Sequence, residues 1–370
     1  MAVQWLRRLR QRRVRWLPRS QWRVRAGLSP ASLSTDLGRA GCYRLTALPP
    51  VSLILPNRNN GPVLELALER LVANTTHPDW ELIVVDDGST DASLSILRRW
   101  RDSGRVPAMT LVEQPAAGAV AALNTALGRA RGELVVQLDG DATVETPGWL
   151  EQMVAVLEGD PRVGVVGAGV VFDNGRVHAF GVDLITPDGM HDRGTRIAEP
   201  RGRRTLHTRV HRPRAERCPE AQGIAEVDAT VGCCMLYPRA LAEEIGGYDL
   251  GFSPVWFDDL DLSLSARRLG RKVLVAPDVR VLHRASLRNP REGGRGLGAL
   301  RRAAGRMTPQ AVKDGVIAAA RLDRPSPAQL ERLHHHYAYW QSKWGWDPLN
   351  PDMDAISRRW GATEVCWRWR

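Results

Sequence analysis

Short apolar segments alternate with helix-forming segments from residue 51 onward. The apolar segments are VSLIL (51–55), ELIVV (81–85), MTLVE (109–113) and ELVVQL (133–138), and the helical ones cover 62–73, 92–100, 120–130 and 148–158. The apolar segments do not alternate with polar residues, which is typical of strands buried on both faces of a parallel sheet. The pattern therefore predicts a doubly wound α/β unit, and such sheets bind ligands at the carboxyl ends of their strands.

The pattern changes after the apolar segment 163–172, which we expect to be a core strand. Shorter and more polar strands are predicted at 178–185, 227–237, 272–277 and 279–283, with helices at 240–246 and 261–270. Gly270 closes the second helix at a position that favours glycine. From Pro309 onward the spacing indicates a small helical tail, in which three successive histidines (334–336) are expected on a solvated face.

These changes divide the 370 residues into four parts, and the length allows about two domains. We expect an arm (1–49), a first α/β half (50–172), a smaller mixed half (173–285), and a loop rich in Arg and Gly that leads into the helical tail (286–370). No apolar run reaches the ~18 residues that would suggest a membrane span. The chain is therefore expected to be a globular protein.

The formal net charge of +11 comes mainly from the N-terminal arm. Residues 1–25 hold nine arginines, the first acidic residue is Asp36, and 43 of the 52 basic residues remain to balance 41 acidic ones elsewhere. Because Trp5, Trp16 and Trp22 lie among the arginines, the arm fits peripheral contact with an anionic membrane; a solvated arm and nucleic-acid binding also stay open. The nearly neutral remainder argues against a nucleic-acid-binding protein.

The cysteines and the N-terminus bear on location. The five cysteines are odd in number and form no Cys-x-x-Cys pair, which fits a reducing compartment and gives no zinc framework. The N-terminus has no apolar segment followed by a small-residue cleavage site, so no secretory signal is expected. We therefore expect a cytoplasmic protein, at the cytoplasmic face of the membrane if the arm binds there.

Acidic residues follow two of the predicted strands. Asp86 and Asp87 come directly after ELIVV, and Asp139 and Asp141 follow ELVVQL. Turn formation is one explanation, because Asp, Gly and Ser are favoured after any strand. In a single sheet, however, the two endings would meet in one crevice, where an Asp-x-Asp pair can hold a divalent cation that grips a diphosphate.

A third acidic group opens a predicted helix. Asp258, Asp259 and Asp261 lie within WFDDLDL, and helix capping is the role expected of Asp261. Capping does not account for all three, because clustered carboxylates repel one another unless a cation or a proton is shared. His283 ends the last predicted strand, where either a structural role or ligation of a metal fits an imidazole.

The ordered set of motifs resembles the family 2 glycosyltransferases with the glycosyltransferase A fold, closest to bacterial rhamnosyl- and galactofuranosyltransferases. The motifs are PNRN (56–59), VVDDGSTD (84–91), Asn124 in a helix, QLDGDA (137–142), GGYD (246–249) and WFDDLDLSL (256–264), followed by a strand that ends at His283. The similarity covers about residues 50–285. It implies an α/β fold with a nucleotide-sugar-binding half at 50–172 and a smaller mixed acceptor and catalytic half at 173–285.

The resemblance also implies roles for individual residues. Asp87 would contact the nucleotide base and Asp139 the ribose side, while Asp141 and His283 would bind Mg²⁺ or Mn²⁺. Asp259 matches the catalytic base of the family. The other residues implied in donor binding are Pro56, Asn57, Asn59 and Asn124, and weaker site candidates are Asp86, Arg58, His178, His191, Trp256 and Asp258. Arg58 stands where the family has Tyr or Phe, and its guanidinium plane can stack on a base.

These roles predict an inverting, metal-dependent glycosyltransferase of the hexosyltransferase class, which moves a sugar from a nucleotide-diphosphate sugar to a hydroxyl acceptor. The acceptor is expected to be a lipid-linked saccharide in the assembly of cell-surface polysaccharide or glycolipid. A sugar nucleotidyltransferase stays as an alternative, although the loop PNRNNG lacks the Gly-rich, Arg-containing character of that class. A basic nucleic-acid-binding protein is the other alternative, and a gel-shift assay with nucleic acid would distinguish it from a glycosyltransferase.

Overall fold

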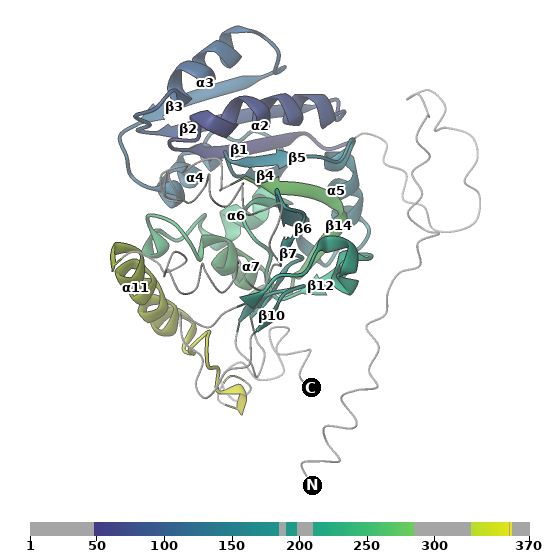
Figure 1. Ribbon diagram of the computed structural model, residues 1–370, viewed down its shortest axis with the longest axis vertical. Helices are drawn as coiled ribbons and strands as arrows, with labels where there is room; N and C mark the ends of the chain where they lie inside the picture. Colours follow the sequence, from purple (N-terminus) through teal and green to yellow (C-terminus); the bar gives the residue numbers. More distant parts are fainter. Residues whose placement is uncertain (1–47, 185–189, 198–209, 285–326, 355, 357–370) are drawn as a thin grey trace, which may run out of the picture.

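The computed structural model describes residues 48–184, 190–197, 210–284, 327–354 and 356 (Figure 1). Almost all of the predicted basic arm, the loop rich in Arg and Gly after residue 284, and the start of the predicted tail lie outside these residues. Within them, no helix is long and apolar enough to cross a membrane.

The described residues form strands and helices in an α/β order. The main-sheet strands are β1 (Val51–Asn57), β2 (Trp80–Asp87), β3 (Met109–Gln114), β4 (Leu134–Leu138), β5 (Ala142–Val144), β6 (Val163–Phe172), β7 (Val177–Ala179), β12 (Ala225–Val227), β13 (Cys234–Pro238) and β14 (Lys272–His283). Two small sheets pair β8 (Val182–Asp183) with β9 (His191–Asp192) and β10 (Arg196–Ile197) with β11 (Val210–His211). The helices are α2 (Gly61–Asn74), α3 (Ser93–Asp102), α4 (Ala119–Leu127), α5 (Trp149–Glu158), α6 (Arg239–Ile245), α7 (Asp258–Arg268) and α11 (Pro327–Trp344), with short 3-10 turns η3 (Ala215–Arg217), η4 (Pro219–Ala221) and η5 (Leu250–Phe252).

The main sheet has the strand order β12-β14-β6-β13-β4-β1-β2-β3 (Figure 1). The pairs β4-β1, β1-β2, β2-β3 and β14-β6 are parallel, whereas β13 runs antiparallel to both β4 and β6. Strands from both predicted halves thus join one sheet. The reversal at β13 brings the end of β14 to the same edge as the ends of β1, β2 and β4.

Helices cover both faces of this sheet, as the apolar strands predicted. Leu53 and Leu55 of β1 pack in a core cluster with α2, α3 and α5, and Ile54 packs in a second cluster with α4, α6 and α7. Successive side chains of a strand point to opposite faces, so a run of apolar residues needs cover on both sides. The predicted doubly wound α/β unit is confirmed, and Cys233 and Cys234 are small buried side chains within it, as expected.

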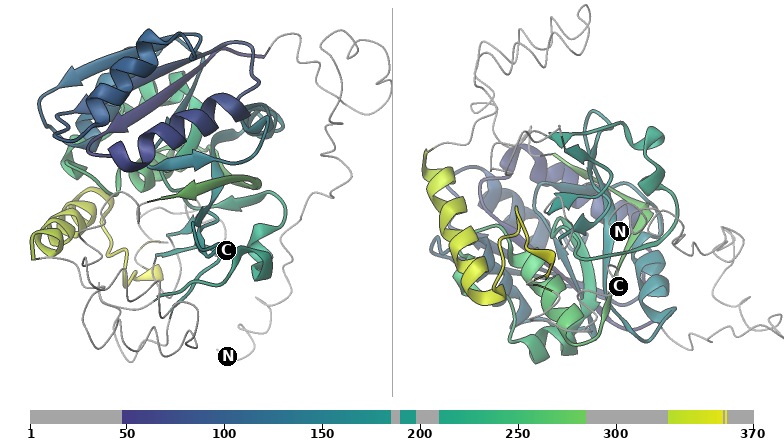
Figure 2. Two further views of the ribbon diagram at one scale, coloured as in Figure 1. Left: turned by 45° about the horizontal axis from the view of Figure 1, so that its top comes forward. Right: turned by 90° about the horizontal axis from the view of Figure 1, so that it is seen from below.

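The helical tail lies against the second half of the chain. Figure 2 shows the yellow helix α11 beside the green segments that include α7. Trp340 and Trp344 of α11 are buried in a third core cluster with Phe252, Phe257 and Leu260. A predicted helix in this part of the chain is therefore confirmed for residues Pro327–Trp344.

Four predicted strands differ from the observed ones. The segment 178–185 is not one strand, because the chain breaks between β7 and β8 at Gly181, which has a φ of +85°. The segment 227–237 holds the end of β12 and most of β13, separated by a turn. The two strands predicted between 272 and 283 are the single strand β14, whose pairing with β6 shifts between Ala276 and Arg280. Pro277 in this irregular stretch lacks the N–H that a regular ladder needs.

Candidate active site

A cleft of about 920 Å³ opens where β1, β2, β4 and β14 end. Among the residues predicted for the site, those that line it are Pro56, Asn57, Arg58, Asp87, Asp139, Asp141, His178, Trp256, Asp258, Asp259 and His283. Asn59, Asp86 and Asn124 are described but do not line it. His191 is placed in β9, where its backbone pairs with that of Asp183; its side chain lies outside the described structure.

Asp139, Asp141 and His283 form a corner of the cleft. One ligand atom from each lies within 4.8 Å of the others, and His283 Nε2 is 3.4 Å from Asp141 Oδ1. The strand pairing explains this approach, because β14 runs antiparallel to β5 with His283 opposite Ala142, the residue after Asp141. Two carboxylates and an imidazole at this spacing fit one divalent cation such as Mg²⁺ or Mn²⁺.

Gly140 lets the PNRN loop pack against this corner. A Cβ on Gly140 would lie 2.5 Å from Asn60 Nδ2 and 3.0 Å from Asn57 Oδ1. Asn60 Nδ2 in turn donates a hydrogen bond of 3.1 Å to Asn57 Oδ1. A side chain between the two aspartates would therefore push the loop after β1 away from the acidic turn.

Asp87 holds the turn that begins α4. Its carboxylate accepts hydrogen bonds from the backbone N–H groups of Ala117 (2.7 Å) and Gly118 (2.9 Å) and from Gln114 Nε2 (2.9 Å). Gly118 has a φ of +99°, and a Cβ there would lie 2.5 Å from Pro254. The half-exposed Arg58 reaches the same carboxylate at 3.5 Å. Asp87, which was predicted to contact the nucleotide base, therefore also connects the surrounding loops.

A second network of hydrogen bonds holds the loop after β1 against the end of β2. Asp86 Oδ2 accepts hydrogen bonds from Asn57 Nδ2 (2.8 Å) and Ser89 Oγ (2.7 Å). Asn59, with a φ of 55°, accepts a hydrogen bond from the backbone N–H of Thr90 through its Oδ1. These side chains connect the ends of β1 and β2, and of them only Asn57 lines the cleft.

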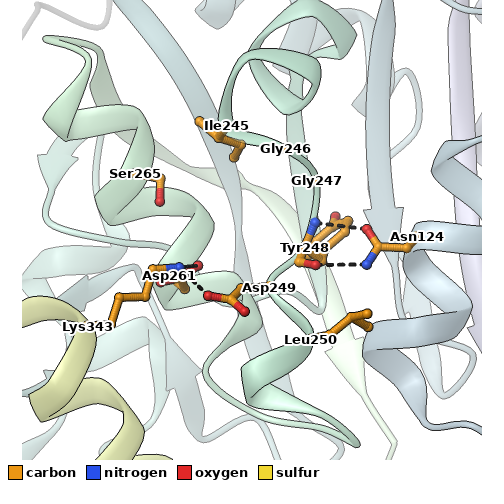
Figure 3. Close-up of a pocket in the computed structure, with 10 residues that line it drawn as sticks. All are labelled: Asn124, Ile245, Gly246, Gly247, Tyr248, Asp249, Leu250, Asp261, Ser265 and Lys343. Carbon is orange, nitrogen blue, oxygen red and sulfur yellow. Dashed lines mark hydrogen bonds and ion pairs between the residues drawn. The ribbon is translucent and has the colours of Figure 1, made fainter.

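Asn124 lies at a different, smaller pocket of about 340 Å³ (Figure 3). Its Nδ2 donates to the carbonyl oxygen of Tyr248 at 2.8 Å, and its Oδ1 accepts from the N–H of the same residue at 2.9 Å. The predicted donor-binding residue thus holds the GGYD segment against α4. The sequence predicts the helix of Asn124 and the GGYD motif, but it does not predict the contact between them.

Asp258 and Asp259 occupy the first turn of α7, as predicted. Asp259 Oδ2 accepts a hydrogen bond of 2.7 Å from the N–H of Gly232, and Oδ1 accepts one of 2.8 Å from Leu260 N. Burial raises the pKa of Asp259 above its ordinary value, although these N–H donors oppose the shift. Burial also raises the pKa of Asp258, and the charges of Asp259 and Asp139 add to it.

Two residues beneath the acids were not identified from the sequence. A Cβ on Gly232 would lie 2.3 Å from Gln137 Nε2 and 3.2 Å from the Cβ of Asp259, so only glycine allows this approach. Gln137 Oε1 accepts a hydrogen bond of 2.8 Å from the hydroxyl of Tyr248. Gln137 is part of QLDGDA, but its burial under the site is set by the neighbouring strand β13.

His178 stacks behind His283. The two rings have centroids 4.9 Å apart with 14° between their planes, and the Phe172 ring lies near both, with its centroid 4.8 Å from that of His178 and 6.2 Å from that of His283. Burial lowers the pKa of His178 to about 4, so its ring is neutral at physiological pH. A neutral ring in this place supports the orientation of His283 without adding a positive charge beside it.

Two predictions outside the cleft are wrong. Asp261 does not cap α7: it accepts hydrogen bonds from Lys343 Nζ (2.8 Å) and Trp344 Nε1 (2.9 Å), because α11 packs over the first turn of the helix. The histidines 334–336 do not all lie on a solvated face. His336 is fully buried, and its Nε2 lies 3.1 Å from the carbonyl oxygen of Ser253.

The family model described as glycosyl transferase family 2 matches residues 52–246, more than half of the chain. The chain belongs to glycosyl transferase family 2. The match includes Asp87, Asp139 and Asp141 and ends before Asp259 and His283. In this family, the doubly wound sheet with one reversed strand beside the acidic turn is the glycosyltransferase A fold, as predicted.

Several curated relatives match this family 2 protein. It is 30% identical over 245 residues to the uncharacterized protein y4gI of Sinorhizobium fredii, covering 66% of this chain and 25% of that protein. It is 27% identical over 245 residues to the O-antigen biosynthesis protein RfbC of Myxococcus xanthus, covering 66% and 18%. The alignments thus span a quarter or less of these relatives. Among solved structures, the mannosyltransferase PcManGT of Pyrobaculum calidifontis, in complex with GDP-Man and Mn²⁺, aligns over 87% of this chain and 79% of its own at 25% identity and a TM-score of 0.47.

Proposed function

We propose that this family 2 protein is an inverting glycosyltransferase that moves a sugar from a nucleotide-diphosphate sugar to a hydroxyl acceptor. One observation carries the proposal: a single cleft joins the ligand set of Asp139, Asp141 and His283 to the carboxylate of Asp259. A cation site and a base are the two parts that a displacement at an anomeric carbon requires. Neither a sugar nucleotidyltransferase nor a nucleic-acid-binding protein accounts for this combination as directly as the family does.

In the proposed reaction, Asp141 and His283 would hold Mg²⁺ or Mn²⁺, and Asp139 would contact the ribose side of the donor. The bound cation supplies charge neutralisation for the diphosphate leaving group. Asp259 takes the proton from the acceptor hydroxyl as its oxygen attacks the anomeric carbon. The bond from that carbon to the diphosphate oxygen breaks, and its electron pair leaves with the nucleoside diphosphate. One displacement from the face opposite the leaving group inverts the configuration at the anomeric carbon.

The nucleotide is proposed to lie at the end of the cleft formed by Pro56, Asn57, Arg58 and Asp87. The turn from Ala117 to Gly118, which Asp87 organises, forms the wall beside it. This placement agrees with the general rule that open α/β sheets bind ligands beyond the carboxyl ends of their strands.

The acceptor is proposed to lie at the other end, beside Trp256 and Tyr337. Aromatic faces of this kind bind the apolar faces of sugar rings. Arg332 lies over the Trp256 ring at 5.4 Å. Among the described cations that line the cleft, Arg58 faces Asp87 and Arg212 faces Asp192, whereas no carboxylate of the described residues lies within ion-pair distance of Arg332. This favours a saccharide acceptor that carries a negative group, such as a phosphate in a lipid linkage.

The pathway is proposed to be the assembly of cell-surface polysaccharide or glycolipid. RfbC is named for O-antigen biosynthesis, and the Bacillus subtilis protein TuaG, 39% identical over 94 residues covering 25% of this chain, is named as a putative teichuronic acid biosynthesis glycosyltransferase. A rhamnosyl or galactofuranosyl donor, the hexosyltransferase class, and a cytoplasmic location with peripheral membrane contact through residues 1–25 remain parts of this proposal.

A panel of nucleotide sugars tests the proposed function. UDP-, GDP- and dTDP-linked hexoses and deoxyhexoses are each incubated with the full chain and Mn²⁺, and release of nucleoside diphosphate and protection against thermal unfolding are measured. We expect one nucleotide class to be hydrolysed and to raise the Tm. Failure of every donor in both measurements, with the protein folded, would contradict the proposed function.

A further inference from the structure

The chain enters the helix of the proposed base through a strained segment. Trp256 and Phe257, directly before Asp258, have φ angles of 82° and 70°. Bulky residues rarely adopt this left-handed conformation, and it persists only where surrounding contacts hold it. The position of Asp259 therefore depends on whatever fixes these two residues.

Helix α11 encloses the ring of Phe257. The ring lies edge-to-face with Tyr337 at 5.2 Å, with Trp340 at 5.7 Å and with His336 at 6.0 Å between ring centroids. Phe257 is only 5% exposed, and both Trp340 and His336 are fully buried. One face of α11 thus packs over this strained residue, which lies two positions before the base.

The same helix also holds Asp261, two residues after the base. Lys343 Nζ donates to Asp261 Oδ2 at 2.8 Å and to Asp249 Oδ2 at 2.5 Å, and Trp344 Nε1 donates to Asp261 Oδ1 at 2.9 Å. Figure 3 shows Lys343 reaching from α11 toward both carboxylates. Burial raises the pKa of Asp261, and the charge and hydrogen bond of Lys343 oppose that shift. The positive charge of Lys343 thereby offsets the cost of burying the Asp261 carboxylate, two residues from Asp259.

We propose that α11 is a positioning element for the base, fixing Phe257 and Asp261 on either side of Asp258 and Asp259. Lys343 is a positioning residue in this arrangement: it does not line the cleft, and it acts on Asp259 only through Asp261 and the first turn of α7. The inference rests on the proposed function, in which Asp259 accepts the proton. In this proposal α11 affects turnover by positioning Asp259, in addition to packing on the hydrophobic core.

The test compares four variants of the full chain. Lys343→Met removes the charge and keeps the apolar stem, Lys343→Arg keeps the charge, and Trp344→Phe removes the N–H that reaches Asp261 together with part of a buried ring. Ser342→Ala, at the exposed neighbouring position, is the matched control. Each is assayed for kcat in hydrolysis of the best donor of the panel, for donor Kd by calorimetry, and for Tm.

We expect Lys343→Met to lower kcat by roughly 10- to 10²-fold, as small misplacements of a catalytic group do, while donor Kd stays nearly unchanged. Lys343→Arg should recover most of this loss, Trp344→Phe should lower kcat less, and Ser342→Ala should match the parent. Hydrogen exchange should increase in Lys343→Met at residues 256–262 and not at 134–141. If Lys343→Met does not fold, the kcat and the hydrogen exchange of Trp344→Phe test the positioning role instead.

The positioning role is overturned if Lys343→Met and Trp344→Phe keep the parental kcat and exchange. It is also overturned if kcat and donor affinity fall together with the Tm and Lys343→Arg restores neither, because that pattern marks a purely structural helix. Asp259→Asn, measured in the same assays, separates failure of the proposed base from failure of the proposed role of α11. An active Asp259→Asn defeats the proposed base itself, whereas an inactive Asp259→Asn with a fully active Lys343→Met defeats only the role of α11.

Discussion

At the scale of single residues, the cation ligands are expected to differ in importance. Asp141 lies against His283 at 3.4 Å, and both were predicted as the metal pair, with Asp139 toward the ribose. Asp141→Ala should abolish metal-dependent donor binding, whereas Asp139→Ala should weaken it less. Calorimetric titration of the donor with and without Mn²⁺ measures both effects. Full activity in excess chelator would contradict the metal assignment.

The pH dependence of turnover should report the burial of Asp259. Burial raises its pKa above the ordinary value for Asp, and a base must be ionised to accept a proton. Turnover should therefore be complete above the raised pKa and fall as the pH decreases through it, with an acidic limb above pH ~3.9, the usual value for Asp. The profile of kcat at saturating Mn²⁺ measures this limb. A flat profile down to the unfolding pH would argue against a buried carboxylate base.

Residue types predicted the cleft better than they predicted single contacts. Asp87, Asp139, Asp141 and His283 were found because polar residues after parallel strands meet at one edge. Asp261 was predicted as a cap because its position in the first turn fits one, and only the packing of α11 directs its side chain elsewhere. Asn124 carries no signal in the sequence that would distinguish a backbone contact from a ligand contact.

At the scale of elements, the acidic turn after β4 depends on its central glycine. Gly140→Ala would place a methyl group 2.5 Å from Asn60 Nδ2, so either the loop after β1 or the two aspartates must move. We expect metal-dependent donor affinity to fall by roughly 10-fold or more, with a destabilisation of about 1–3 kcal/mol from overpacking. Donor calorimetry and denaturant unfolding check the two effects. An unchanged donor Kd would mean that the loop yields without disturbing the site. Gly128→Ala is a suitable control for the general cost of replacing a glycine, because Gly128 has a φ of −64° and an added Cβ there would meet only ordinary contacts of 3.5 Å or more.

Elements with continuous apolar runs were predicted closely, and those set by long-range packing were not. The strands β1, β2 and β4 each contain an apolar run, are almost wholly buried and lie between helices on both faces, so their pattern is unambiguous. The segment 227–237 also contains an apolar run, yet it turns between β12 and β13, where the N–H of Gly232 donates to Asp259. Contacts of α11 with Phe257 and Asp261 join residues about 80 positions apart, which a local pattern does not report.

At the scale of the whole molecule, the charge is divided between a basic arm and a nearly neutral remainder. Because arginine and tryptophan together favour anionic membrane surfaces, deletion of residues 1–25 should release the protein from anionic liposomes. Donor hydrolysis should be nearly intact, since the described cleft contains none of these residues. Co-sedimentation with liposomes, alongside neutral vesicles as a control, measures the release. Continued sedimentation of the truncated protein would place the membrane contact elsewhere.

For the whole molecule, the proposed function requires that the cation corner and Asp259 act on one substrate in one cleft. Turnover and calorimetric donor binding of Asp259→Asn test it most directly, with Asp258→Asn as the neighbouring control. Asp259→Asn should bind donor and Mn²⁺ like the parent and lose turnover by roughly 10²- to 10⁴-fold, the usual cost of removing a general base, while Asp258→Asn loses less. Near-parental turnover of Asp259→Asn would contradict the account; an inactive Asp258→Asn beside it would move the base one residue earlier.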